Sequence, residues 1–190
     1  MGELEIDAEG WLPGVRHHPS VNCDLRPGAE LPTLVVVHAI SLPPNQFSGD
    51  GVLQLFSNTL DGNEHPYYAT ISHLRVSAHF FIRRDGEIIQ FVSCAPRAWH
   101  AGVSEWQGRQ RCNDFSIGIE LEGCDEQEFT GKQYLQLQLL TQALLRRYPI
   151  NTMAGHSDIA PGRKTDPGPC FDWQRIECAL PMLQLASRRC

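Results

Sequence analysis

The sequence lacks a surplus of basic residues. Its 16 lysines and arginines stand against 22 aspartates and glutamates, which gives a formal charge of −6. Because a protein that grips the phosphate backbone needs a basic face, we expect no nucleic-acid partner. The sequence also lacks an apolar run of the roughly 20 residues that cross a bilayer, since its most apolar stretch, 34–37, stops at His38. We therefore expect no membrane partner.

Features of exported proteins and of zinc fingers are missing as well. The amino terminus is acidic and has neither a basic segment nor an apolar stretch of signal-peptide length. The cysteines are odd in number and form no Cys-x-x-Cys pair, which favours reduced thiols over a disulfide framework. These absences predict a cytoplasmic protein. The seven cysteines are Cys23, Cys94, Cys112, Cys124, Cys170, Cys178 and Cys190.

The composition is typical of one globular domain. A chain of 190 residues that is 42% hydrophobic and 20% charged is long and apolar enough to bury a core. Prolines at three positions predict that residues 1–30 form an irregular arm packed on a domain that spans residues 31–190. No internal repeat or extra domain is evident, so we expect no obligatory protein partner.

Two segments have the patterns of strands that end in chemically active residues. Residues 33–38 form a β-branched, apolar run that predicts a buried strand ending at His38. Residues 116–122 alternate with period two, so Glu120 and Glu122 share the face opposite three apolar side chains. Between them, residues 80–92 predict a hairpin with a tight two-residue turn at Asp85-Gly86.

Helical spacing predicts two helices in the second half of the chain. One begins after Thr130 as its N-cap and ends before Pro149. The other begins after Asp172 and is stopped by Pro181. Strands mixed with helices favour an α/β domain whose sheet is covered by helices.

Side chains that bind metal ions occur in three separate parts of the sequence. Imidazole and carboxylate groups are good zinc ligands, and a catalytic zinc site uses three of them and leaves the fourth position for water. His38, His156 and Asp166 fit that count. Asp158 and Cys170 are rival ligands, although Asp158 is more typical of a residue that hydrogen-bonds its own loop. Spacing alone does not choose among them.

Five motifs in order resemble the zinc-dependent N-acetylmuramoyl-L-alanine amidase family. They read VVHAISLPP (36–44), HLRVSAH (73–79), RAWHAG (97–102), NDFSIGIELEG (113–123) and GH followed by RKTDPGP (155–169). The likeness covers residues 11–173 and is strongest to the cytoplasmic members of Gram-negative bacteria, which recycle cell-wall fragments. It implies a single-domain amidase fold with a mixed central β-sheet flanked by α-helices. The implied reaction hydrolyses the amide between (1,6-anhydro)-N-acetylmuramic acid and the L-alanine of the stem peptide.

The resemblance also implies roles for individual residues. It assigns one zinc ion per chain to His38, His156 and Asp166. It makes Glu120 the general base and Lys164 the group that stabilises the oxyanion. The pattern of alternation does not separate Glu120 from Glu122, which is alternatively an orienting or ion-paired neighbour.

Three further residues match family positions near the substrate, an anhydromuropeptide. They are Arg75, Arg111 and His100, and a guanidinium suits this place because it can hold a carboxylate with two hydrogen bonds. An ordinary surface ion pair is the alternative for each arginine. The chain departs from its cytoplasmic relatives at Ala39, where they often have an asparagine, so we expect an effect on peptide preference. Residues 41–51 are predicted to form a mobile wall of the cleft.

Two other functions share these features. A peptidoglycan-recognition module would bind the muropeptide without cutting it, and a zinc peptidase would cut between amino acids. The presence of all three ligand-type residues argues against the first, and the mass of the products separates the second.

Overall fold

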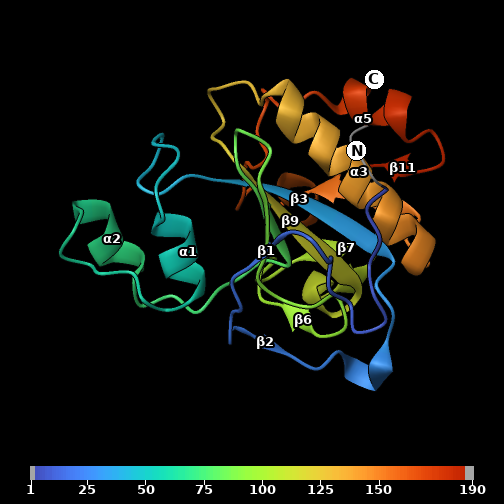
Figure 1. Ribbon diagram of the computed structural model, residues 1–190, viewed down its shortest axis with the longest axis horizontal. Helices are drawn as coiled ribbons and strands as arrows, with labels where there is room; N and C mark the ends of the chain where they lie inside the picture. Colours follow the sequence, from blue (N-terminus) through green and yellow to red (C-terminus); the bar gives the residue numbers. More distant parts are fainter. Residues whose placement is uncertain (1–2, 187–190) are drawn as a thin grey trace.

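The computed structural model describes residues 3–186 and is built around one mixed, seven-stranded sheet (Figure 1). β5 runs antiparallel to β4, and the other neighbouring strands are parallel. The predicted mixed sheet is therefore confirmed. In spatial order the strands are β1 (Arg16–His17), β5 (Ile88–Gln90), β4 (Phe80–Ile82), β9 (Ser116–Glu122), β3 (Leu34–Ile40), β10 (Thr152–Gly155) and β11 (Gln184–Leu185).

The two central strands are the ones whose patterns were clearest in the sequence. β3 and β9 pair in parallel over seven residues, from Leu34 opposite Ser116 to Ile40 opposite Glu122. Because side chains alternate along a strand, Val35 and Val37 point to one face, and Leu34, Val36 and His38 point to the other. All seven residues of β9 are buried, since helices or loops cover both of its faces.

Two helices cover the face toward which Val35 and Val37 point, as Figure 1 shows. α3 (Gly131–Arg147) begins with the capping box of Thr130 and Gln133 and packs against α5 (Trp173–Ala179). The side chain of Asp172 caps α5 by accepting a hydrogen bond from the backbone of Arg175. Both predicted helices and both predicted N-caps are confirmed.

Shorter elements cover the opposite face. α1 (Gly51–Phe56) and α2 (Pro66–Ile71) pack their apolar residues over β4 and β5. The 3₁₀ helix η2 (Cys112–Phe115) and α4 (His156–Ile159) pack over Leu34 and Val36. The remaining elements are η1 (Pro27–Ala29), the pair β2 (Cys23–Asp24) and β6 (Arg97–Ala98), and the pair β7 (Glu105–Trp106) and β8 (Arg109–Gln110).

The turn between β4 and β5 differs from the prediction. The strands form the expected hairpin, but their last pair is Ile82 opposite Ile88, so residues 83–87 form a longer turn. Gly86 has φ 92°, which suits a glycine. The prediction of a turn at Asp85-Gly86 was wrong because the N–H of Gly86 donates to the carbonyl of Arg83, which closes the turn around Arg84 and Asp85 and leaves Gly86 as an extra residue before Glu87.

The amino-terminal residues are mostly irregular but also extend the sheet. β1 pairs in parallel with β5, and Leu12 is completely buried. Six cysteines are free thiols in the part of the chain that the structure describes, whereas Cys190 lies outside the described residues. Among residues 3–186, no helix combines the length and the apolar character needed to cross a membrane.

Candidate metal centre and cleft

The register of the sheet brings the three ligand-type residues together. His38 lies on β3, opposite Glu120 on β9, so both side chains point to the face away from α3. His156 is the first residue of α4 and follows β10, whose Gly155 pairs with Val37. Residues 118 positions apart in the sequence thus meet because β3 lies between β9 and β10.

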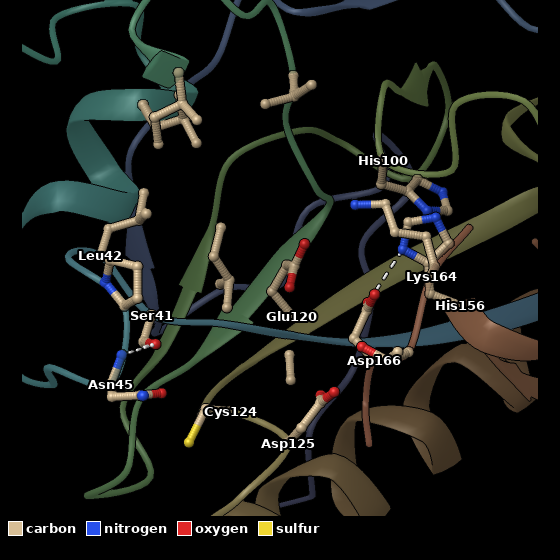
Figure 2. A pocket seen from close by; sticks show the side chains of 18 of the residues that line it. Ser41, Leu42, Asn45, His100, Glu120, Cys124, Asp125, His156, Lys164 and Asp166 are labelled. Carbon is tan, nitrogen blue, oxygen red and sulfur yellow. Dashed lines mark hydrogen bonds and ion pairs between the residues drawn. The ribbon is translucent and has the colours of Figure 1, made fainter. Parts of the chain in front are cut away.

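Asp166 completes the group from the loop after α4. The loop is tied to that helix by a backbone hydrogen bond from Ser157 to Asp166. Asp166 Oδ2 lies 3.2 Å from His38 Nδ1 and 3.1 Å from His156 Nδ1, and the two Nδ1 atoms are 2.9 Å apart. Figure 2 shows Asp166 and His156 at one end of the cavity, with Glu120 facing it.

This triangle of atoms fits a divalent metal ion. Two ligand atoms at zinc-bond lengths and a tetrahedral angle would lie about 3.3 Å apart, close to the three distances observed. A ring nitrogen holds at most one proton, so hydrogen bonds alone do not join all three atoms pairwise in neutral rings. Among the described residues, His38, His156 and Asp166 form one metal-ligand group, and Asp158 and Cys170 are not part of it. Asp158 instead accepts a hydrogen bond from the backbone of Gly155.

The protonation of the group suits metal binding. Burial lowers the pKa of His38 to about 4, so its ring is neutral at physiological pH and has a free lone pair. Burial raises the pKa of Asp166, but its contacts with the rings of His156 and His38 outweigh burial and leave the pKa well below its usual range. The site therefore offers two imidazoles and one carboxylate, a ligand set that zinc accepts.

Glu120 is a buried carboxylate beside this group. It is 8% exposed, and its Oε2 has no hydrogen-bond partner among the described residues. Burial raises the pKa of Glu120 well above its usual value, the charge of Asp166 raises it further, and Lys164 lowers it. Lys164 itself is exposed and lines the same cavity. A carboxyl group with a raised pKa next to a cleft is suited to taking up and returning a proton.

The cavity has a volume of about 550 Å³ and two unlike walls. Glu120, Lys164 and Asp166 supply charge on one side. Apolar side chains from α1, α2 and the loops around them form the other side, and Ala39 also lines the cavity. These apolar residues are Leu42, Leu55, Phe56, Ile71, Leu74 and Val76.

The three predicted substrate-binding residues lie in different surroundings. His100 is buried, lines the cavity, and lies against His38 with 2.9 Å between His38 Nε2 and His100 Nδ1. Arg75 is exposed, and its guanidinium donates to carbonyls of its own loop at Ser72, His73 and Leu74. Arg111 is also exposed, forms an ion pair with Asp114, and lines a second cavity of about 490 Å³.

Glu122 is separated from the centre. It lies one pleat further along β9 than Glu120 and is 4% exposed. Its two oxygens accept hydrogen bonds from the backbone N–H groups of Ser48, at 2.6 Å, and Arg84, at 3.0 Å. Glu122 therefore anchors the loop that follows β3, a contact that alternation along β9 alone did not reveal.

The sequence also did not reveal three contacts around the histidines. The carbonyl of Ala101 lies 3.2 Å from His156 Nε2. Asn113 Oδ1 accepts from the backbone of His100 and Ala101, and Ser116 Oγ lies 3.1 Å from His100 Nε2. Both side chains belong to the motif at 113–123, but nothing in their spacing pointed to the histidines.

A mixed sheet that brings a group able to hold a metal ion and a buried carboxylate into one cleft is typical of a metal-dependent hydrolase domain. Residues 28–169 match the N-acetylmuramoyl-L-alanine amidase family, and the chain belongs to that family. The 1,6-anhydro-N-acetylmuramyl-L-alanine amidase AmpD of Citrobacter freundii is 61% identical over 174 residues, covering 90% of this chain and 93% of its own. AmpD of Escherichia coli K12 is 60% identical over 170 residues, covering 88% and 93%.

Solved structures agree with the sequence relatives. A crystal structure of a selenomethionine AmpD derivative has a TM-score of 0.89 at 60% identity and covers 90% of this chain and 97% of its own. The amidase AmiD of E. coli, solved in complex with its substrate, has a TM-score of 0.57 at 27% identity, with 93% of this chain and 65% of its own covered. The single-domain amidase fold is therefore confirmed, and the protein is an N-acetylmuramoyl-L-alanine amidase.

Proposed function

We propose that this amidase is zinc-dependent and hydrolyses the amide between 1,6-anhydro-N-acetylmuramic acid and the L-alanine of the stem peptide, in the recycling of muropeptides. The observation that carries the proposal is the triangle of His38, His156 and Asp166 beside the buried carboxylate of Glu120. The names of the relatives at about 60% identity support the substrate. The AmiD complex contains anhydro-N-acetylmuramic acid linked to L-Ala-D-γ-Glu-L-Lys, a substrate of the same class.

His38, His156 and Asp166 would hold one zinc ion. When bound, zinc polarises a carbonyl and brings the pKa of water down from 15.7 toward about 7. Glu120 and Lys164 line the same cavity as His156 and Asp166, so both could act on a substrate bound beside the ion.

Glu120 acts as the general base. Its unpartnered Oε2 would remove a proton from the attacking water and return it to the departing amine of L-alanine. Lys164 lines the same cleft and supplies an ammonium for the oxyanion of the tetrahedral intermediate. Loss of one such donor typically costs about 10²–10³ in rate.

The two walls of the cavity support a proposal for the rest of the substrate. The apolar wall packs against the non-reacting parts of the sugar and the alanine methyl group. Arg75 and Arg111 are exposed and do not line this cavity, and we keep both as predicted contacts of the stem-peptide carboxylates. The six free thiols support a reducing compartment, so we propose that the reaction takes place in the cytoplasm.

A defined anhydromuropeptide tests the proposal. Zinc-loaded protein should release anhydro-N-acetylmuramic acid and a peptide that begins with L-alanine, identified by mass spectrometry. A chelator should stop the reaction, and added zinc should restore it. Binding without products would indicate a recognition module, and fragments cut between amino acids would indicate a peptidase.

A further inference from the structure

The outer nitrogens of the two histidine ligands contact neighbouring residues. His38 Nε2 lies 2.9 Å from His100 Nδ1, and His156 Nε2 lies 3.2 Å from the carbonyl oxygen of Ala101. The Nδ1 atom of each ligand ring belongs to the metal group, so in a neutral ring the proton sits on Nε2. The two adjacent residues His100 and Ala101 thus accept the outer N–H of both ligands.

Ser116 sets the direction of the hydrogen bonds that run from His38 through His100. The Ser116 hydroxyl donates to the carbonyl of Cys112 at 2.6 Å, so its oxygen accepts from His100 Nε2 at 3.1 Å. The lone pair of His100 therefore lies on Nδ1, where it accepts from His38. The series of hydrogen bonds from His38 ends on the carbonyl of Cys112, and the hydrogen bond from His156 ends on the carbonyl of Ala101. A carbonyl has no proton to donate, so each ligand ring keeps its proton on Nε2.

Asn113 holds the backbone that accepts both bonds. Its Oδ1 accepts from the N–H of His100 at 3.2 Å and of Ala101 at 2.8 Å. Arg163 adds a hydrogen bond of 2.8 Å to the same Ala101 carbonyl. From behind, the buried guanidinium of Arg26 donates to the backbone carbonyls of Asn113 and Ser116. The side chain of His100 is therefore held by Ser116, and the backbone of His100 and Ala101 is held by Asn113.

Close packing leaves His100 and Ser116 no freedom to shift. Ser116 is completely buried and His100 is 9% exposed. A Cβ added to Gly118 would lie 2.4 Å from Cγ of His100, so the ring rests directly on the backbone of β9. At such depth bulk water does not replace a lost hydrogen-bond partner, so a donor left without an acceptor destabilises this arrangement.

We propose that Asn113 and Ser116 are positioning residues of the metal centre, which act through His100 and Ala101 to hold both histidine ligands with Nδ1 free for the metal. This inference rests on the proposed function, because it takes the group of His38, His156 and Asp166 to be the zinc site. Neither residue touches the metal ligands or the reacting atoms directly.

The test compares the zinc affinity of four variants with that of the unaltered chain. Ser116→Ala and Asn113→Ala each remove one support, and loss of such outer contacts typically costs about 10–100-fold in metal affinity. We expect the zinc dissociation constant, measured by competition with a chromogenic chelator at fixed pH, to rise by that factor in both. The melting temperature of the metal-free proteins is recorded alongside, so that affinity is compared between folded chains.

Two of the variants are matched controls. Ser93 is also a buried serine that donates to a backbone carbonyl, that of Glu9, and accepts one backbone N–H, that of Ala95. Ser93→Ala therefore removes the same groups away from the cleft, and its zinc affinity should stay unchanged. Asn113→Asp keeps an oxygen that accepts both N–H groups, so it should restore most of the affinity that Asn113→Ala loses.

The possible outcomes separate a failure of the proposed function from a failure of this inference alone. If the unaltered chain neither binds zinc nor cuts the muropeptide, the proposed function fails and this inference falls with it. If the unaltered chain does both, and Ser116→Ala and Asn113→Ala bind zinc as tightly as Ser93→Ala, only the inference is wrong. Should Ser116→Ala not fold, the pair Asn113→Ala and Asn113→Asp still decides it.

A spectroscopic measurement on the unaltered chain needs no variant. In the zinc-loaded protein, nitrogen-15 shifts of the side chains should show His38, His100 and His156 all protonated at Nε2 and not at Nδ1. A proton on Nδ1 of His100 would reverse the hydrogen bonds between His38, His100 and Ser116 and would overturn the role of Ser116.

Discussion

His38 and Glu120 are register partners on adjacent parallel strands, and their side chains point to the same face of the sheet. Neighbouring strands lie about 4.8 Å apart, so the register fixes how close the carboxylate stands to the ligand. Glu120 is paired on both sides, with His38 on β3 and with Phe81 on β4, and His38 directly follows Val37, the last residue of β3 that pairs with β10. The separation of His38 from Glu120 is thus a property of β3 and β9 and does not depend on a loop.

Replacing Glu120 by glutamine should remove catalysis and keep the metal. Gln has nearly the same size but does not accept a proton, and general-base catalysis contributes about 10²–10⁴ in rate. We expect kcat for an anhydromuropeptide to fall by that factor, while zinc analysis still finds close to one ion per chain. A Glu120→Gln protein that turns over within a few-fold of the unaltered rate would exclude Glu120 as the base.

Asp166→Ala should release the metal. In the proposed site, the carboxylate would supply one of the three ligand atoms and would be the charged one. We expect dialysed protein to retain far less than one zinc per chain and to lose turnover with it. Asp172→Ala is the control, because that aspartate caps α5 and lies outside the site. It should cost about 1 kcal/mol of stability and leave the zinc content unchanged. Full zinc occupancy in Asp166→Ala would contradict the ligand assignment.

The parts of the fold that could be predicted are those with a strong local pattern. β3, β9 and the caps of α3 and α5 are encoded by alternation, helical spacing and polar residues at helix starts. α1 and α2 have six residues each and take their stability from packing on β4 and β5, so the local pattern did not show them.

The site was predictable by residue type and likeness but not by contact. Glu120 and Glu122 have the same local pattern, and they differ because Ser48 and Arg84 donate to Glu122 and Arg83 forms an ion pair of 3.9 Å with it, all from other segments. His100 was expected near the substrate, and its contact with His38 depends on the space that Gly118 leaves beside β9. Contacts between distant segments of this kind are set by the packed structure.

Removing Glu122 should loosen the loop and leave the metal in place. Glu122→Ala removes the acceptor of the N–H groups of Ser48, which is exposed, and Arg84, which is half-buried, and each lost hydrogen bond costs about 0.5–1.5 kcal/mol. Because residues Ser41 to Asn45 of the same loop line the cleft, KM should rise more than kcat falls. Urea unfolding, zinc analysis and steady-state kinetics test the three parts. A loss of zinc would mean that Glu122 supports the metal centre.

The ion pair of Asp24 and Arg97 should make stability depend on pH in acid. Hydrogen bonds from Arg97 lower the pKa of Asp24 from 3.8 to about 2. Because the folded pKa lies below the unfolded value, the pair stabilises the fold above about pH 4, and this contribution disappears as the pH falls toward 2. In metal-free protein, the difference in unfolding free energy between the unaltered chain and Asp24→Asn should shrink over that interval. A difference that stays constant from pH 5 to pH 2 would contradict the shift.

Glycine at position 118 should matter for the metal centre, whereas glycine at 131 should not. A Cβ on Gly118 would overlap the ring of His100, with 2.4 Å to its Cγ, so Gly118→Ala must displace the ring that accepts the outer N–H of His38. Overpacking of this kind costs about 1–3 kcal/mol, and we expect weaker zinc binding as well.

Gly131 is the matched control for the same change. It begins α3, and a Cβ there meets nothing within 4 Å. Gly131→Ala should therefore raise the unfolding free energy by about 0.4–1 kcal/mol, since alanine restricts the unfolded chain and fits a helix. Thermal unfolding with and without zinc measures both effects. If Gly118→Ala kept the full stabilisation by zinc, the position of the His100 ring would not control the metal centre, because the ring must move to make room for the methyl group.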